Sequence, residues 1–150
     1  MDAEMVFARL GVAALAGLVI GLDRELRGIS AGIRTHALVS LSSAVITVSA
    51  MLLYEQLHVP GNVDVDPLRV VQGLAQAIGS IAAGVIFVSK GDVHNLTSAA
   101  NIWLAAALGI AAGLGQFTLL AMALGLGIVI VTGVRFLERF IPGTGKASRE

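Results

Sequence analysis

Cysteine is absent from this chain of 150 residues, and charged residues make up only 13% of it. Without cysteine, the chain has no disulfide, no thiolate metal ligand and no cysteine nucleophile. Soluble domains average roughly 25% charged residues. The shortage of charge, together with a hydrophobic content of 56% and a mean hydropathy of +0.86, therefore indicates a membrane protein. Because nearly all of the chain is apolar, we expect a single domain with no separate soluble catalytic unit.

Recognisable catalytic motifs are missing as well. The sequence contains no serine nucleophile elbow, no glycine loop for phosphate and no helix with two zinc-binding histidines. Its histidines, His36, His58 and His94, are predicted on different loops, which disfavours a three-histidine metal site. The charges are dispersed and lack a nucleic-acid-binding pattern. We therefore expect a protein that is not an enzyme, requires no cofactor or metal, and binds no nucleic acid.

Long apolar runs dominate what is present. They lie near residues 5–22, 37–57, 70–88, 98–115 and 117–136. Each is about 20 residues long, enough to cross the core of a bilayer as a helix. The pattern predicts an all-α, polytopic membrane protein with five transmembrane helices. The connection at 113–116 carries no charge, so we expect a tight hairpin between the fourth and fifth runs, with a re-entrant element as the alternative.

The basic residues give this arrangement a direction. If all five runs cross, eight of the ten Lys and Arg residues fall on one side. These are Arg24, Arg27, Arg34, Lys90, Arg135, Arg139, Lys146 and Arg149, and Arg9 and Arg69 remain on the other side. Cytoplasmic loops accumulate Lys and Arg, so the N-terminus is predicted outside and the C-terminus inside. The start, Met1 to Glu4, is acidic where a signal peptide would be basic, so the first span is expected to be retained.

Small residues recur at four-residue spacing within the runs. The seams are Ala13, Gly17 and Gly21; Ala75, Gly79 and Ala83; Ala105, Gly109 and Gly113; and Ala121 and Gly125. Helices in lipid associate by close packing at such seams. We expect most of them to pack helices within one chain. Because there are so many, at least one is a candidate for self-association, which predicts a homo-oligomer.

Two polar stripes also run along the predicted spans. The first contains His36, Ser40, Ser43 and Thr47, and the second Arg69, Gln72, Gln76 and Ser80. One interpretation is hydrogen bonding between helices. The other is that the stripes face each other and line a water-accessible cleft. No Asp, Glu or Lys lies in the middle of the second to fifth runs, and Mg²⁺ prefers carboxylate oxygens and retained waters, so a metal site at the membrane midplane is not predicted.

The densest charge cluster lies between the first two runs, from Asp23 to Arg34. Its candidate binding residues, for a ligand or a partner, are Asp23, Arg24, Glu25, Arg34, Thr35 and His36, joined by Thr97 and Asn101 at the start of the fourth run. A short loop could bring Asp23 and Arg34 together as a hydrogen-bonded ion pair. The cluster is then either a loop staple and topology signal, or a pocket for an anion or a partner in which Arg24 and Arg34 are ligands.

Two blocks of sequence resemble the MgtC/SapB family of bacterial inner-membrane proteins. The first is Gly17-Leu-Val-Ile-Gly21-Leu22-Asp23-Arg24-Glu25 with Ala31-Gly32-Ile33-Arg34-Thr35-His36-Ala37-Leu38-Val39, and the second runs from Ile78 through Leu96-Thr97-Ser98-Ala99-Ala100 and Trp103 to Gly115. The resemblance implies a five-helix membrane domain, here residues 1–140, in a short member without a C-terminal cytoplasmic domain. Residues 141–150 are expected to form a flexible cytoplasmic tail.

The resemblance also frames the expected function. Members of the family are linked to growth under magnesium limitation and to virulence, and are often labelled magnesium transporters. We expect a multi-pass protein of the bacterial inner (plasma) membrane, surrounded by the lipid bilayer, that modulates a membrane protein partner or adaptation to magnesium limitation. The alternative is a transporter or channel for Mg²⁺ or another small solute. A third hypothesis is a purely structural homo-oligomer.

Overall fold

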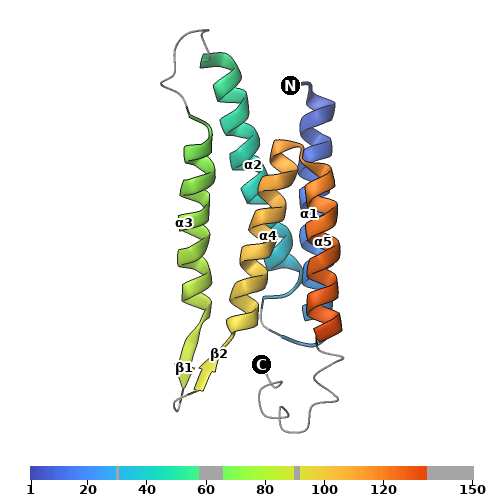
Figure 1. Cartoon of the computed structure of the whole chain (residues 1–150), viewed down its shortest axis with the longest axis vertical. Helices are drawn as coiled ribbons and strands as arrows, with labels where there is room; N and C mark the ends of the chain where they lie inside the picture. Colours follow the sequence, from blue (N-terminus) through green and yellow to red (C-terminus); the bar gives the residue numbers. More distant parts are fainter. Residues whose placement is uncertain (30, 58–65, 90–91, 135–150) are drawn as a thin grey trace.

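The computed structural model describes residues 1–29, 31–57, 66–89 and 92–134, which form five helices and a short β-hairpin (Figure 1). The elements are α1 (Ala3–Glu25), α2 (Ile33–Leu57), α3 (Leu68–Val85), β1 (Phe87–Ser89), β2 (Asp92–His94), α4 (Leu96–Leu114) and α5 (Phe117–Val129), which continues into a π-helical turn, η1 (Ile130–Val134). The all-α prediction is confirmed for the bundle. The predicted tail at 141–150 and His58 lie outside the described residues.

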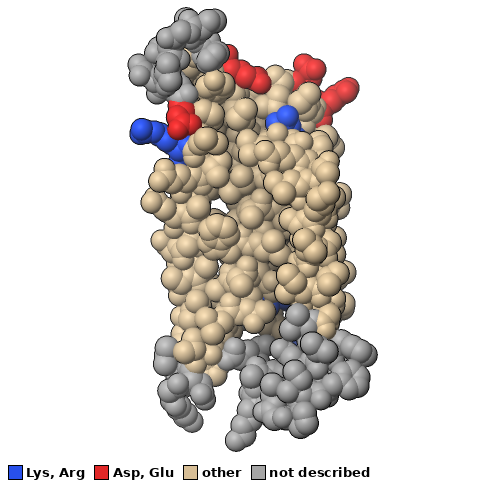
Figure 2. Space-filling model, in the orientation of Figure 1, with Lys and Arg blue, Asp and Glu red and all other residues tan. Residues whose placement is uncertain are grey.

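Five helices occupy the five apolar runs, and four of them, α1 to α4, are long and apolar enough to cross a membrane. The fifth apolar helical stretch, Phe117–Gly133, is shorter. Among the described residues, the charges on the face seen in Figure 2 gather at the end that holds the N-terminus, above an uncharged middle band. Arg24, Arg27 and Arg34 lie at the opposite end of the bundle. The five crossings and the direction of insertion remain predictions.

A short β-hairpin joins α3 to α4. Helix α3 ends at Val85, and Phe87–Ser89 pairs antiparallel with Asp92–His94. The rings of Phe87 and His94 stack with their centroids 4.9 Å apart, and aromatic and β-branched residues favour strands over helices. The Asn95 side-chain amide donates a hydrogen bond to the carbonyl of Val85 over 3.1 Å, which ties the start of α4 to the end of α3.

Helix α4 lies at the centre of the bundle, packed between α1, α2 and the outer helices. Its seam of small residues meets α2: a Cβ added at Gly109 would lie 2.9 Å from the Ser43 Cβ, and one at Gly113 would lie 2.7 Å from the Thr47 Cβ. The order of these contacts makes α2 and α4 parallel. The seam of α1 meets α2 in the antiparallel sense, with Gly17 against Ala37. Intramolecular packing is therefore confirmed for these two seams.

The predicted small-residue seams of α3 and α5 make no close contacts through their glycines among the described residues. A Cβ added at Gly79 on α3 or at Gly125 on α5 would meet no atom within 4 Å. On α5 the close contact is instead made by Gly127, where an added Cβ would lie 2.7 Å from a methyl carbon of Leu104. The glycines of these two predicted seams therefore do not form close helix contacts within the described part of the chain.

The two polar stripes do not face each other, so the alternative interpretation, in which they line a cleft between them, is wrong. His36, Ser40, Ser43 and Thr47 are buried where α2 meets α1 and α4. The Ser40 hydroxyl donates to the carbonyl of Ala13 over 2.7 Å, as the hydrogen-bonding interpretation predicted, whereas the Thr47 hydroxyl bonds back to the carbonyl of Ser43 in its own helix over 2.7 Å. The stripe of α3 is exposed, because this helix packs on the bundle through its opposite side, which carries Leu74, Ile78 and Ala82.

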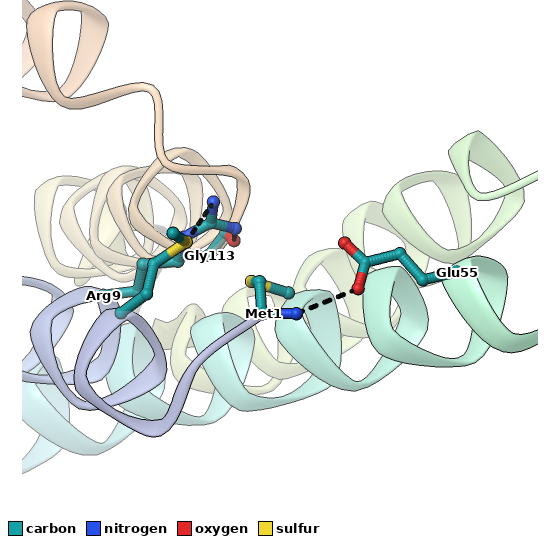
Figure 3. A network of polar contacts seen from close by, with 5 residues as sticks. Met1, Arg9, Glu55 and Gly113 are labelled. Carbon is teal, nitrogen blue, oxygen red and sulfur yellow. Dashed lines mark hydrogen bonds and ion pairs between the residues drawn. The ribbon is translucent and has the colours of Figure 1, made fainter.

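Polar contacts tie the helices together at the N-terminal end (Figure 3). Arg9 donates a hydrogen bond to the carbonyl of Gly113 over 2.7 Å, in the last turn of α4. A cation in this place offsets the partial negative charge of the carbonyl end of a helix. The amino group of Met1 lies 3.2 Å from a carboxylate oxygen of Glu55, near the end of α2. Arg9 thus joins α1 to the hairpin of α4 and α5, which turns at Gly115 with a φ of 76°.

Candidate functional site

Arg24 is the centre of a polar cluster at the end of the bundle opposite the N-terminus. Its side chain lies in the last turn of α1 and is only 3% exposed. Its Nε donates to the carbonyl of Ala31 over 3.2 Å, and an Nη donates to the Ser98 hydroxyl on α4. A buried guanidinium is tolerated only when its donors find acceptors. Arg24 therefore joins α1, the connection to α2 and the start of α4.

The Arg24 cluster is formed by residues of α1, α2 and α4 and of the connection between α1 and α2. We use the name for Asp23, Arg24, Glu25, Arg27, Ala31, His36, Ser98 and Asn101. Five of them, Asp23, Arg24, Glu25, His36 and Asn101, were predicted from the sequence. Arg34, Thr35 and Thr97 were predicted too, but make no hydrogen bond within the cluster among the residues described.

Asp23 forms its ion pair with Arg27, four residues further along the chain, rather than with Arg34 as predicted. Residues at this spacing lie on the same face of a helical turn, and the chain continues as turns after Glu25, so Arg27 reaches Asp23 first. Arg34 is exposed on the first turn of α2 and has no ion pair with any residue in the described ranges. Within the described part of the chain, the guanidinium of Arg34 is therefore not engaged by an acidic group.

Glu25 caps the beginning of α2. One of its carboxylate oxygens accepts a hydrogen bond from the backbone N–H of Ile33 over 3.0 Å. The first N–H groups of a helix lack partners within the helix, and a negative charge is stabilising beside them. A Cβ added at Gly32 would collide with the same carboxylate. Although Glu25 is exposed, its carboxylate stabilises the first turn of α2 and so helps to fix the position of α2 relative to α1.

His36 is fully buried on the second turn of α2, with 0% of its surface exposed. Its Nδ1 lies 2.9 Å from the carbonyl oxygen of Gly32. Because a carbonyl oxygen can only accept, we assign the hydrogen to Nδ1, which leaves the Nε2 atom as an acceptor. This Nε2 atom has no hydrogen-bond partner within the described part of the chain.

Asn101 supplies a complementary group on α4. It is 4% exposed, and its side-chain nitrogen, a donor, is buried without a partner among the described residues. Gly109 of α4 contacts Ser40 of α2, and the two helices are parallel. Asn101 lies eight residues, about two turns, before Gly109, which places it beside the first turn of α2. His36 and Asn101 therefore bring an unused acceptor and an unused donor to the same end of the bundle.

Arg27, Ala31 and Ser98 are the members of the cluster that were not among the predicted site residues, and Thr97 was chosen in place of Ser98. Four-residue spacing connects Thr97 to Asn101 and Ala105, but each such step drifts about 40° around an α-helix. Thr97 therefore lies about 80° from Ala105, whereas Ser98, seven residues before it, lies only about 20° away. Accordingly Ser98 is buried and Thr97 is exposed. The signal was present in the sequence as the seven-residue spacing.

The cluster offers few ligands for a metal ion. Within residues 1–29, 31–57, 66–89 and 92–134, no three His, Asp or Glu side chains gather into a group that could hold one. The two carboxylates of the cluster already accept hydrogen bonds from Arg27 and from the backbone of Ile33. The arrangement is chemically suited to fixing three helix ends and to presenting Arg34 beside them.

Several long apolar helices with charged clusters at their ends define a multi-pass membrane protein. A family model described as the MgtC family matches residues 10–140. The chain therefore belongs to the MgtC family, and the family prediction from the sequence is confirmed. No solved structure matches it.

Three bacterial relatives show the extent of the similarity. YhiD of Escherichia coli K12 is named as a candidate magnesium transporter. It is 36% identical to this chain over 119 residues, which are 79% of this chain and 55% of YhiD. SapB of Bacillus subtilis is 37% identical over 115 residues, covering 75% and 49% of the two chains. MgtC of Salmonella typhimurium LT2 is 36% identical over 105 residues, covering 70% and 42%. The chain spans about half the length of the curated relatives it matches.

Proposed function

We propose that this protein is a non-enzymatic, five-span protein of the bacterial inner membrane, with its C-terminus in the cytoplasm, that modulates a membrane protein partner during adaptation to magnesium limitation. The partner would bind at the Arg24 end of the bundle, through residues that the fold leaves exposed there. The magnesium context is taken from the name of the relative YhiD and from the family resemblance.

The observation that carries this proposal is the contrast between Arg24 and Arg34. Arg24 is buried and its donors are used to hold helices together. Arg34 is exposed and makes no ion pair with the described residues, although it lies next to the helix start that Glu25 caps. A guanidinium can bind a carboxylate through two parallel hydrogen bonds. Arg34 therefore suits an acidic group on a partner, and the Arg24 cluster fixes the helix turn that carries it.

Co-purification from native membranes tests the proposal. The tagged protein is expected to recover a reproducible membrane partner, and Arg34→Ala should reduce that recovery about tenfold, because a charge-assisted hydrogen bond at an interface contributes about 1.5–3 kcal/mol. Arg69→Ala is the matched control, since Arg69 is exposed near the opposite end of the bundle and should leave recovery unchanged. Equal recovery with Arg34→Ala and the parent protein would contradict the proposal.

Transport of Mg²⁺ is the second candidate function, and the name of YhiD favours it. The sequence has no Asp or Glu between Arg34 and Glu55, none between Arg69 and Val85, and none throughout α4 and α5. Moving a divalent cation through hydrocarbon without such groups is costly. We therefore expect purified protein in liposomes to show no Mg²⁺ flux above that of empty vesicles. A flux that Asp23→Asn abolishes would instead establish transport.

A further inference from the structure

One side of α3 is polar and points away from the bundle. Its polar side chains are Gln72, Gln76 and Ser80, all of them exposed. The helix packs against its neighbours through the opposite side, where Leu74, Ile78 and Ala82 are buried. At 100° per residue, Gln76 lies about 160° around the helix from Ile78, the middle of the buried side. Nothing in the described part of the chain covers the polar side.

This exposure is unfavourable at the depth that α3 occupies. The helix is 18 residues long and apolar enough to cross a membrane, and Gln76 lies near its middle. A side-chain amide placed in hydrocarbon gives up its hydrogen bonds to water, and this is unfavourable unless another group replaces them. Polar side chains on membrane helices therefore face other protein surfaces. The polar side of α3 requires a partner that offers both donors and acceptors.

We propose that this partner is a second copy of the same chain, with α3 of one copy packed along α3 of the other. Two copies inserted in the same direction are related by a twofold axis along the membrane normal, which places each residue near its own counterpart. An amide carries both a donor and an acceptor, and so does a hydroxyl, so Gln76 can bond to Gln76 of the second copy. No charged residue lies between Arg69 and Val85, so no like charges meet there.

The backbone of α3 also permits a close approach. Gly73 lies between Gln72 and Gln76 in the sequence, about 60° around the helix from Gln76 and about 20° from Ser80. A Cβ added at Gly73 would meet no atom within 4 Å. Small residues at a helix interface let two backbones come near enough for interhelical hydrogen bonds. The open space beside Gly73 is therefore where the second copy of α3 would lie, a contact distinct from the proposed site at Arg34.

Disulfide formation in native membranes tests the contact directly, because the chain contains no cysteine of its own. Ser80→Cys keeps both glutamines and places a thiol on the proposed twofold contact, where facing Cα atoms can come within the roughly 7 Å that a disulfide spans. Oxidation should convert most of this variant to a covalent dimer. Ile81→Cys is the matched control: Ile81 is also exposed but lies about 100° further around the helix, and should give at least fivefold less dimer.

A second variant separates the role of the glutamines from simple proximity. In the Ser80→Cys background, Gln72→Leu with Gln76→Leu should lower the yield of dimer about tenfold at limiting expression, since two interhelical hydrogen bonds are lost. Leucine is more compatible with lipid than glutamine, so the variant should still insert and fold. Dimer yields that are equal for Ser80→Cys and Ile81→Cys, a Ser80→Cys variant that stays monomeric, or a cross-link to a protein of different mass would each overturn the proposal.

Discussion

Gly17→Ala is expected to destabilise the protein by about 3 kcal/mol, at the upper end of what overpacking a close contact costs. The added Cβ would lie 2.7 Å from the Ala37 Cα and 2.8 Å from the carbonyl carbon of His36. Both are backbone atoms of α2, so no side-chain rotation can relieve the clash and the two helices must separate. The loss is measured as a lower midpoint of thermal unfolding in mild detergent, followed by circular dichroism.

Gly11→Ala provides the matched control on the same helix. A Cβ at Gly11 would meet no atom within 4 Å, and alanine is a better helix former than glycine by about 0.8–1 kcal/mol. This variant should therefore unfold at the same temperature as the parent protein or slightly higher. If the two substitutions lowered stability equally, the close approach of α1 and α2 would not be the cause.

Arg24→Leu is expected to cost about 3 kcal/mol of stability, the scale on which removing one member of a buried charged network acts. The carbonyl of Ala31 and the Ser98 hydroxyl would lose their donor, and the three helix ends would lose their common link. Arg24→Lys should recover only part of this stability, because one ammonium group cannot reproduce the forked geometry of guanidinium.

Thermal unfolding and protease sensitivity in detergent would both report the loss at Arg24. Arg34→Ala is the control, because Arg34 is exposed and exposed charges contribute about 0–1 kcal/mol. Buried polar groups can sometimes be replaced by apolar ones without loss. An Arg24→Leu protein as stable as the parent would therefore show that the cluster is not needed to hold the helix ends.

The helices could be predicted because each arises from a local property, the length of an apolar run. The seams at Gly17 and Gly109 could be predicted for the same reason, since close packing in lipid depends on small residues at regular spacing. The hairpin turn at Gly115 follows from a glycine that tolerates a positive φ at the end of a helix. The β-hairpin could not be foreseen, because three-residue strands are too short to show an alternating pattern.

Contacts between distant residues were harder to predict, because the rotation of each helix decides them. Asp23 was expected to pair with Arg34, but the turns that follow α1 place Arg27 beside Asp23, and these two residues form the ion pair. Thr97 and Ser98 are neighbours in the sequence. Because four residues turn an α-helix about 40° more than one full turn, the face that a four-residue pattern follows moves around the helix, and only this rotation shows which of the two faces the core. The stripe of α3 was recognised correctly as one face. Whether this face points into the bundle or away from it depends on which side of α3 packs against α4, and the sequence of α3 alone does not determine that.

The parallel packing of α2 on α4 sets an order of events during biosynthesis. Helices α1 and α2 are made first and meet each other through Gly17 and Gly21, so they can enter the bilayer as a hairpin. The Ser43 side of α2 is covered only when Gly109 of α4 reaches it. Until α3 and the β-hairpin have also been synthesised, α4 is absent and the Ser43 side of α2 lacks the neighbour that covers it in the folded bundle. Insertion of the fourth helix is therefore the step that commits the bundle to its final form.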